Sequence, residues 1–154
     1  MLLFLHLDVL GNVAYGPRAQ KLRRDEARAL ALEMLERLDA AVLASRRPGE
    51  LSGGQAARVA LARALATRPR AMLIDEPFAA VDVEYTPRLR VAVKAALAEV
   101  GCPCIIVTHD PADVAALADD VAVLENGRIV EHGPATEVMA CPESSFGKLL
   151  FDRD

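Results

Sequence analysis

Cysteine is scarce in this sequence, and acidic residues outnumber basic ones. The three cysteines, Cys102, Cys104 and Cys141, match neither a disulfide framework nor a metal-binding spacing. Cys102 and Cys104 are also one residue too close together for the redox dithiol motif, so we predict three reduced thiols without a chemical role. The chain has 18 Lys and Arg residues, 22 Asp and Glu residues and a formal net charge of −4. This balance argues against nucleic-acid binding, which would show as a basic face.

Long apolar runs are also absent. No run approaches the length that spans a bilayer. The apolar first five residues lack a charged leading segment and are interrupted by His6 and Asp8, so they do not form a signal peptide. What the sequence does contain is 53% hydrophobic and 26% charged residues in 154 positions. That composition excludes a disordered polymer and is enough for one domain with a core.

Residues 51–55 (Leu-Ser-Gly-Gly-Gln) form a predicted glycine turn that opens a helix over residues 56–66. These residues are rich in Ala, Leu and Arg and contain neither Pro nor Gly. The N–H groups at such a turn have no partner inside the helix and lie at the positive end of its dipole. The turn therefore suits an anion such as a phosphate, although two glycines alone are equally consistent with an ordinary turn.

A short apolar run, Met72–Asp75, ends in two carboxylates, Asp75 and Glu76, followed by Pro77. It predicts a buried strand that delivers both acids to its carboxyl end, where open α/β sheets bind ligands. A phosphate-binding turn followed by an acidic strand end is typical of nucleotide and Mg²⁺ chemistry. Taken alone, the two acids are also consistent with a solvated strand end.

The remaining pattern predicts a helical block followed by an α/β layer. Residues 3–16 are apolar, and Gly11, Asn12 and Pro17 are expected to punctuate the end of this segment. Strand–helix–strand alternation after residue 70 indicates an α/β fold with a mostly parallel sheet and an antiparallel hairpin at its end. The other predicted elements are a helix over residues 21–39, a helix over 84–100, a strand over 104–108, a helix capped by Asp110 with Pro111 in its first position, a hairpin of strands 121–125 and 128–132 turning at Asn126-Gly127, a break at Gly133-Pro134, and short helices near 135–140 and up to Leu150.

Four motifs, in this order, resemble those of the ATP-binding-cassette (ABC) ATPases. Residues 51–55 are similar to that family's signature motif, and residues 72–77 are similar to its Walker B motif. Residues 79–82 (Ala-Ala-Val-Asp) resemble its D-loop, with Val81 in place of the usual leucine, and residues 107–110 (Val-Thr-His-Asp) resemble its switch-histidine segment. Four ordered matches leave little room for chance.

The resemblance implies an incomplete P-loop NTPase (ABC ATPase) fold. Residues 1–66 would be the helical subdomain with the signature motif. Residues 67–154 would be the C-terminal part of the RecA-like core, with Walker B, the D-loop and the switch histidine. The family's Walker A loop, Gly-x-x-x-x-Gly-Lys-Ser/Thr, occurs nowhere in this sequence, and by motif order it and the Q-loop would lie before Met1. We therefore expect an N-terminally truncated chain that is inactive alone, because the main site for the β- and γ-phosphates is absent.

The same resemblance assigns the nucleotide contacts. In the family, two subunits hold two ATP molecules head to tail, and each signature loop closes on the γ-phosphate bound to the other subunit. By resemblance, Ser52, Gly53, Gly54 and Gln55 would make this contact in trans, with glycine required where backbone approaches phosphate. Arg58, on the same predicted helix, is expected to be a charge on the helix surface or at an interface.

The resemblance also assigns the residues of hydrolysis. Asp75 would hold Mg²⁺ through water, and Glu76 would be the general base that orients the attacking water. His109 would hydrogen-bond the γ-phosphate and that water, and Asp82 would report across the dimer interface. A lone histidine or aspartate in such a loop is also consistent with an ordinary surface residue.

The function implied is that of the ATP-binding, ATP-hydrolysing subunit of an ABC importer for a small solute, located in the cytoplasm on the inner face of the cell membrane. Residues 12–17 and 142–151 are most similar to molybdate- or sulfate-type oxyanion importers. The partners would be a second ATPase subunit and a membrane permease whose coupling helix meets residues 3–16. The alternative is a non-catalytic remnant or interaction module that docks on a permease or an intact ATPase. A soluble ABC ATPase of DNA repair is set aside, because those insert a long coiled coil where residues 17–50 hold one ordinary helix.

Overall fold

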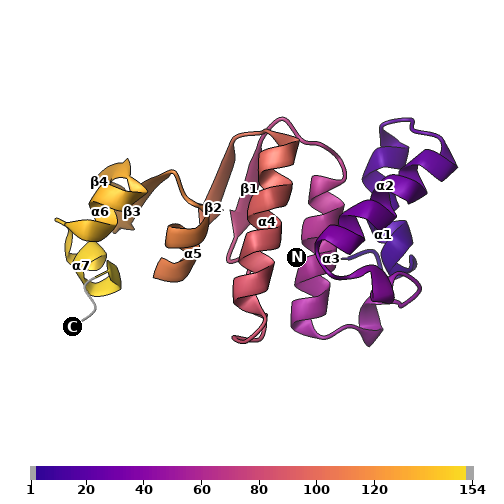
Figure 1. The fold of residues 1–154 in the computed structure, drawn as a ribbon, viewed down its shortest axis with the longest axis horizontal. Coiled ribbons are helices and arrows are strands. Elements are labelled where there is room, and N and C mark those ends of the chain that lie inside the picture. The colour runs from indigo at the N-terminus through magenta and orange to yellow at the C-terminus, as the bar shows by residue number, and fades with distance from the viewer. Residues whose placement is uncertain (1–2, 152–154) are drawn as a thin grey trace. The chain divides into compact units, whose positions relative to one another are not determined.

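The computed structural model describes residues 3–151, and the chain divides into two compact units, Met1–Ile106 and Val107–Asp154. In chain order, the elements up to the boundary are α1 (Val9–Ala19), α2 (Arg24–Arg37), the short 3₁₀ helices η1 (Ala41–Leu43) and η2 (Pro48–Glu50), α3 (Gly53–Leu65), β1 (Met72–Asp75), α4 (Thr86–Val100) and β2 (Cys104–Val107). The elements that follow are α5 (Pro111–Leu117), β3 (Asp120–Glu125), β4 (Arg128–Pro134), α6 (Ala135–Ala140) and α7 (Ser145–Phe151) (Figure 1). Helices, a small parallel sheet and a hairpin confirm the predicted α/β fold class. The functional division at residue 66 stays a prediction.

Helices α1, α2 and α3 pack against one another at the N-terminal side of the first unit (Figure 1). Helix α2 confirms the helix predicted over residues 21–39, with shorter bounds. It begins after Arg23, whose N–H donates to the Glu26 carboxylate. The buried positions of α2 recur every three or four residues, which places them on one face of the helix; they are Ala27, Ala31, Met34 and Leu35.

Helix α1 runs through the residues that were predicted to punctuate its segment. The Asp8 carboxylate caps it by accepting the N–H of Gly11 at 2.6 Å, and the helix continues past Asn12 and Pro17. Asn12 is fully buried, and its side chain accepts the N–H of Phe4 at 2.7 Å and donates to three carbonyls of the preceding turn. The predicted break was wrong because Asn12 uses its polar atoms to fix the turn before the helix. Pro17 lies inside α1 and supplies no N–H to the helix, yet the helix continues to Ala19.

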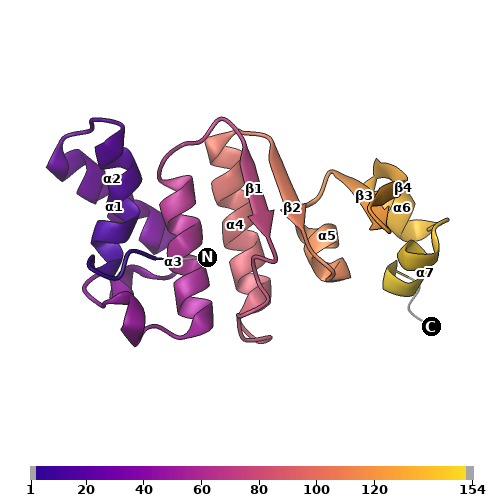
Figure 2. The same cartoon turned by 180° about the vertical axis from the view of Figure 1, so that it is seen from behind.

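Strands β1 and β2 are hydrogen-bonded neighbours connected through α4, and they form a parallel strand–helix–strand unit. At the start of the pair, the N–H of Met72 donates to the carbonyl of Pro103 at 2.9 Å. Met72 and Ile74 are buried, whereas Leu73 is 82% exposed. Helix α4 covers one face of β1, and the face that carries Leu73 and the exposed Ile105 is uncovered among the described residues (Figures 1 and 2). Strand β1 has its predicted bounds.

The second unit contains the predicted hairpin of β3 and β4. Asn126 and Gly127 have φ values of 48° and 76°, and positive φ at both positions is what a type I′ hairpin turn requires. Strand β4 continues through Gly133 and Pro134, where a break was predicted, because these residues pair with the first residues of β3. Proline is accepted at such an open strand end, where no ladder donor is needed.

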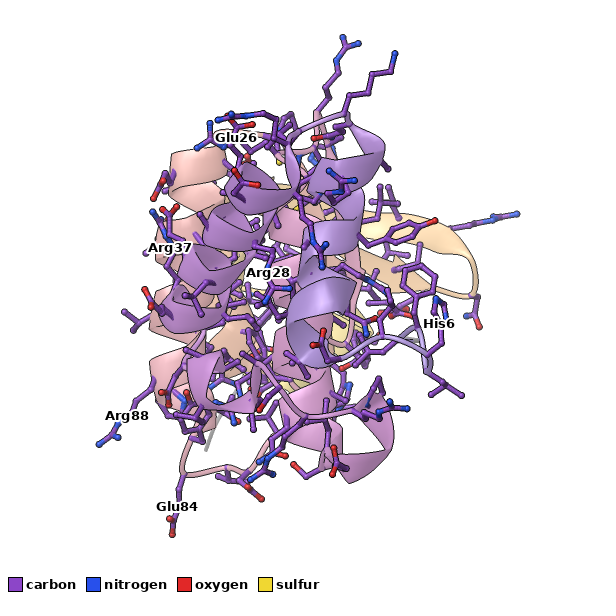
Figure 3. All side chains as sticks on the ribbon, turned by 90° about the vertical axis from the view of Figure 1, so that its right-hand side faces the viewer. His6, Glu26, Arg28, Arg37, Glu84 and Arg88 are labelled. Carbon is purple, nitrogen blue, oxygen red and sulfur yellow. The ribbon has the colours of Figure 1, made fainter. Side chains whose placement is uncertain are left out.

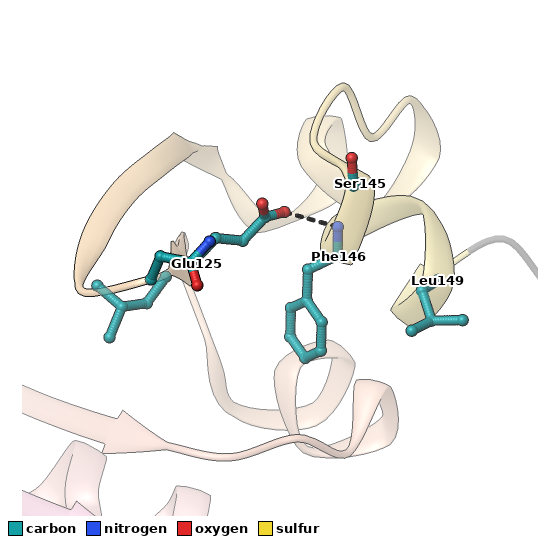
Figure 4. A pocket seen from close by; sticks show the side chains of 6 residues that line it. Glu125, Ser145, Phe146 and Leu149 are labelled. Carbon is teal, nitrogen blue, oxygen red and sulfur yellow. Dashed lines mark hydrogen bonds between the residues drawn. The ribbon is translucent and has the colours of Figure 1, made fainter.

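Helix α7 is attached to the hairpin by two carboxylates. Glu131 accepts the N–H groups of Glu143 at 2.9 Å and Ser144 at 3.0 Å, together with the Ser144 hydroxyl. Glu125 accepts the N–H of Phe146 at 2.7 Å (Figure 4). The hydrogen bond from the Ser144 hydroxyl, followed by the two N–H bonds, lowers the pKa of Glu131 below its ordinary value.

Candidate functional site

Ser52 is the N-cap of α3 and forms a capping box with Gln55. The Ser52 hydroxyl accepts the N–H of Gln55 at 3.3 Å, and the Gln55 side chain accepts the N–H of Ser52 at 3.1 Å. The helix predicted over residues 56–66 therefore starts earlier, at Gly53, and ends at Leu65. Ser52 and Gly53 are exposed at the positive end of this 13-residue helix.

Gly54 packs on the backbone of residues 79–82 of the same chain, the predicted D-loop. A Cβ at Gly54 would lie 2.9 Å from the carbonyl oxygen of Ala80 and 3.2 Å from the Cα of Val81. A Cβ at Gly53 would lie 3.3 Å from the Cβ of Ala80. The structure thus brings the predicted signature and D-loop residues together, and Gly54 is needed for this approach of one backbone to another.

The two acids at the end of β1 differ in their surroundings. Asp75 is exposed and, by the two-residue period of the strand, shares the uncovered face with Leu73. Glu76 is half-buried with φ at 46°, a left-handed conformation that disfavours any residue with a Cβ. Such backbone strain costs about 1–3 kcal/mol, persists only where the surroundings fix it and clusters at functional sites. Pro77 and Phe78, both buried, follow directly.

The D-loop backbone is held at both ends by hydrogen bonds. The Asp82 carbonyl accepts the N–H of Tyr85 at 3.0 Å, the N–H of Thr86 at 3.0 Å and the Thr86 hydroxyl at 2.9 Å. At the other end, the N–H of Val81 donates to the carbonyl of Phe78 at 3.0 Å. Asp82 itself is exposed.

His109 belongs to the second unit, on the turn that leads into α5, and it is exposed. The preceding Thr108 hydroxyl donates to the buried carboxylate of Asp113 at 2.6 Å and accepts the N–H of Asp110 at 3.1 Å. Asp110 caps α5 and Pro111 is its first residue, as predicted. Sequence reasoning missed Asp113. Its position three residues after the N-cap Asp110 is the signal that could have identified it. Its bond to Thr108 fixes the turn that carries His109.

Sequence reasoning also missed a cluster of three side chains in the first unit, formed by Asp39, Arg58 and Tyr85. The Tyr85 hydroxyl donates to the Asp39 carboxylate at 2.7 Å, and Arg58 donates to that hydroxyl at 3.1 Å and to the main-chain carbonyl of Asp39. The guanidinium carbon lies 4.5 Å from the centre of the Tyr85 ring. Burial, followed by the bond to Asp39, raises the pKa of Tyr85. The Arg58 side chain is only 14% exposed, so it is not a solvated helix-surface charge, and the alternative of an interface charge stays a prediction.

The acidic end of β1 fits Mg²⁺ bound together with nucleotide phosphates. Among residues 3–151, no group of three His, Cys, Asp or Glu side chains is arranged to hold a metal ion by itself. Mg²⁺ needs no such cage, because it usually takes one or two carboxylates, several waters and phosphate oxygens. Asp75 offers an exposed carboxylate of that kind beside Glu76. When bound, Mg²⁺ would neutralise charge on the phosphates.

A separate surface near the start of α1 gathers aromatic side chains. The ring centre of Phe4 lies 4.6 Å from that of Tyr15 and 6.0 Å from that of His6, and the guanidinium carbon of Arg63 lies 5.1 Å from it. Leu5, in the same segment, is 75% exposed. Figure 3 shows His6 on the segment that precedes α1. We name Phe4, Leu5, His6 and Tyr15 the α1 surface.

The second unit has a shallow hollow between the hairpin turn and α7 (Figure 4). Its carboxylate, that of Glu125, already accepts the N–H of Phe146. The lining residues are Leu124, Glu125, Asn126, Ser145, Phe146 and Leu149. None of the predicted site residues is among them, so the hollow is not part of the candidate site.

Comparison with known proteins assigns the family. The family model described as "ABC transporter" matches residues 2–79, which is about half of the chain. The molybdenum import ATP-binding protein ModC of Mycobacterium tuberculosis is 45% identical over 150 residues, covering 95% of this chain and 41% of that protein. The spermidine/putrescine import ATP-binding protein PotA of Acidothermus cellulolyticus is 43% identical over 144 residues, covering 94% and 38%. The molybdate/tungstate import ATP-binding protein WtpC of Archaeoglobus fulgidus is 42% identical over 153 residues, covering 99% and 62%.

The chain spans about two fifths of the length of the ModC and PotA relatives. Within residues 3–151, no helix is both long and apolar enough to cross a bilayer. The matched residues 2–79 include the predicted signature motif, the acidic end of β1 and the first residue of the predicted D-loop. The chain therefore belongs to the ABC transporter family, among relatives that are import ATP-binding proteins.

Proposed function

We propose that this chain is the signature-bearing part of the ATPase subunit of an ABC importer. In this proposal two subunits pair head to tail. Ser52 and Gly53 of one subunit contact the ATP that the other subunit holds. The arrangement that carries the proposal is the exposed N-terminus of α3, packed through Gly54 on the D-loop. That arrangement presents a hydroxyl and backbone N–H groups at a positive helix end, which suits a γ-phosphate.

Hydrolysis is assigned to residues at the ends of the two parallel strands. Asp75 holds Mg²⁺ through water, and Glu76 accepts a proton from the attacking water. His109 contacts the γ-phosphate, and Asp82 lies at the contact between subunits. Two observations support these roles: backbone strain such as that of Glu76 clusters at functional sites, and the Thr108–Asp113 bond holds the turn that carries His109.

The proposed cargo is a small oxyanion of the molybdate type, and the proposed partner is a membrane permease. Two of the relatives are import ATP-binding proteins for molybdenum and for molybdate or tungstate, which supports an oxyanion. The α1 surface, with Leu5 exposed among aromatic rings, is the proposed contact for the permease. That contact would hold the subunit on the inner face of the membrane.

The test uses a fused protein in which a P-loop-bearing segment of an ABC ATPase precedes Met1. It should hydrolyse ATP, and Ser52→Asp should lower kcat at least tenfold without lowering Tm. Aspartate is as good an N-cap as serine, so α3 keeps its cap, but its charge repels the γ-phosphate. Ser52→Asn is the matched control, because it keeps the cap without the charge. A fused protein that folds and binds ATP but does not turn it over, or a Ser52→Asp variant with wild-type kcat, would contradict the proposal.

A further inference from the structure

We propose that Asp39, Arg58 and Tyr85 are positioning residues that hold the signature motif in a fixed orientation to the D-loop of the same chain. The inference rests on the proposed function, because it concerns the two loops that would meet the nucleotide of the partner subunit. All three side chains belong to the first unit. They come from three different parts of it: the end of α2, the body of α3 and the start of α4.

Arg58 connects the cluster to the signature motif. It follows Gln55 by three residues in α3, so the two residues lie on neighbouring positions of one helix. Its guanidinium contacts the Tyr85 hydroxyl, the Tyr85 ring and the Asp39 carbonyl at once. With the Arg58 side chain only 14% exposed, loss of these partners would leave a largely desolvated cation without compensation. Helix α3 cannot shift along its axis without disrupting these contacts.

Tyr85 connects the cluster to the D-loop. Its own N–H and the N–H and hydroxyl of Thr86 all donate to the carbonyl of Asp82. Since Thr86 is buried and starts α4, these bonds leave the backbone from Asp82 to Tyr85 little freedom. The backbone that carries the Tyr85 ring is therefore bonded directly to the end of the D-loop.

Asp39 closes the cluster through both its main chain and its side chain. Its carbonyl accepts from Arg58 while its carboxylate accepts from the Tyr85 hydroxyl. Its φ is 51°, a left-handed conformation that aspartate adopts at a cost unless local contacts favour it. These contacts join residues 46 positions apart in the sequence.

Two contacts are needed to fix orientation, and the first unit provides both. The approach of Gly54 to Ala80 is one point of contact between α3 and the D-loop. The bond from Arg58 to Tyr85 is a second point of contact, one helical turn away from the glycines, and it further restricts the orientation of α3 to the D-loop.

The test compares Tyr85→Phe with Tyr15→Phe, since these are the two tyrosines of the chain. Each substitution removes one hydroxyl and keeps the ring. In the 154-residue chain, amide hydrogen exchange of residues 79–82 should become about tenfold faster in Tyr85→Phe, as expected for loss of a hydrogen bond to a charged group. Exchange in β1 should be unchanged, and Tyr15→Phe should match the wild type at residues 79–82. If removal of the Tyr85 hydroxyl lowered only the global stability, amide exchange in β1 would become faster as well.

In the fused protein, Tyr85→Phe should lower kcat five- to tenfold and leave KM for ATP within twofold, because ATP is bound by the P-loop of the other subunit. Arg58→Lys, which keeps the charge but loses the planar fork, should behave in the same way. Unchanged exchange at residues 79–82, exchange that rises equally in β1, or faster exchange with unchanged kcat would each overturn the positioning role. A wild-type fused protein without ATPase activity would instead overturn the proposed function, while the exchange result would still decide whether the cluster fixes the D-loop.

Discussion

Gly54 and Ala80 lie so close together that a Cβ on Gly54 would be 2.9 Å from the carbonyl oxygen of Ala80. Real Cβ atoms essentially never approach another heavy atom this closely. The glycine of the signature motif therefore has a packing role inside its own chain, in addition to the phosphate contact expected from sequence. Substitutions at this position will change stability as well as any contact with nucleotide.

Gly54→Ala should lower the free energy of unfolding by about 1–3 kcal/mol, because the added methyl group overlaps backbone atoms that cannot rotate away. For a chain of this length, that loss lowers Tm by roughly 2–4 °C per kcal/mol. Thermal unfolding followed by circular dichroism measures it. Gly49→Ala is the matched control, since a Cβ there meets nothing within 4 Å. Equal Tm values for the two variants would contradict the close approach.

Glu76→Gln should nearly abolish ATP turnover in the fused protein while ATP binding is kept. An amide has the shape of the carboxylate but cannot accept the proton of the attacking water, and Asp75 remains to hold Mg²⁺. Steady-state hydrolysis and nucleotide binding by calorimetry measure the two effects. The control is Glu84→Gln, since Glu84 is an exposed acid that points away from the ribbon in Figure 3. Turnover within about threefold of wild type, less than ~1 kcal/mol in the barrier, would rule out Glu76 as the base.

The 154-residue chain by itself should not bind ATP tightly. The N-terminus of α3 can contribute about 1–2 kcal/mol toward a phosphate, whereas micromolar affinity needs about 8 kcal/mol. The sequence has no Gly-x-x-x-x-Gly-Lys-Ser/Thr loop to supply the difference. Calorimetry of the folded chain with Mg-ATP measures the affinity. Micromolar binding would mean that the nucleotide site lies elsewhere than proposed.

Cysteines placed on the α1 surface should cross-link to a co-expressed permease. Leu5→Cys is the variant of choice, because Leu5 is 75% exposed, whereas Asn12 is buried and Asp8 caps α1. The native cysteines are first replaced by serine. Val91→Cys is the control, since Val91 is 71% exposed and belongs to α4, which is not part of the α1 surface. Equal yields at positions 5 and 91, or no adduct from Leu5→Cys with a folded chain and permease, would contradict the proposed contact.

Acid should destabilise the chain partly through Glu131. Hydrogen bonds from Ser144 and Glu143 hold the pKa of Glu131 below its ordinary value of 4.5. A carboxyl with a lowered pKa in the folded state contributes stability that is complete above the unfolded pKa and is lost as pH falls through the folded pKa. The unfolding free energy of the wild type should therefore fall more steeply below about pH 4.5 than that of Glu131→Gln. Denaturant titrations across this range test it, with the exposed Glu137→Gln as control, and parallel curves for wild type and Glu131→Gln would contradict the prediction.

Local patterns predicted the elements that local chemistry determines. The apolar run Met72–Asp75 predicted the bounds of β1, although alternate residues of this strand are exposed where a buried strand was expected. Asn126-Gly127 predicted the hairpin, because a type I′ turn depends on those two residues. The capping of α5 by Asp110 was readable for the same reason. The signature and Walker B residues were identified through resemblance, and the structure brings the first of them together with the D-loop.

Features that depend on the folded arrangement of the chain could not be predicted. Asn12 looks like a helix breaker, but its buried amide bonds the turn before α1, and only the folded turn shows this. Arg58 looks like a surface charge because its partners, Asp39 and Tyr85, are far away in the sequence. The left-handed φ of Glu76 has no local sequence signal, because a glycine or asparagine would be the expected residue there.

Because the backbone of Glu76 is left-handed, the residue that would be most stable at position 76 differs from the residue that the proposed activity needs. Glu76→Gly would relax the backbone and raise the unfolding free energy by up to about 1 kcal/mol, after the greater flexibility of glycine in the unfolded chain is subtracted. It would also remove the proposed proton acceptor. A library selected for thermal stability alone should therefore accumulate glycine or asparagine at position 76, and its most stable members would be the least able to turn over ATP.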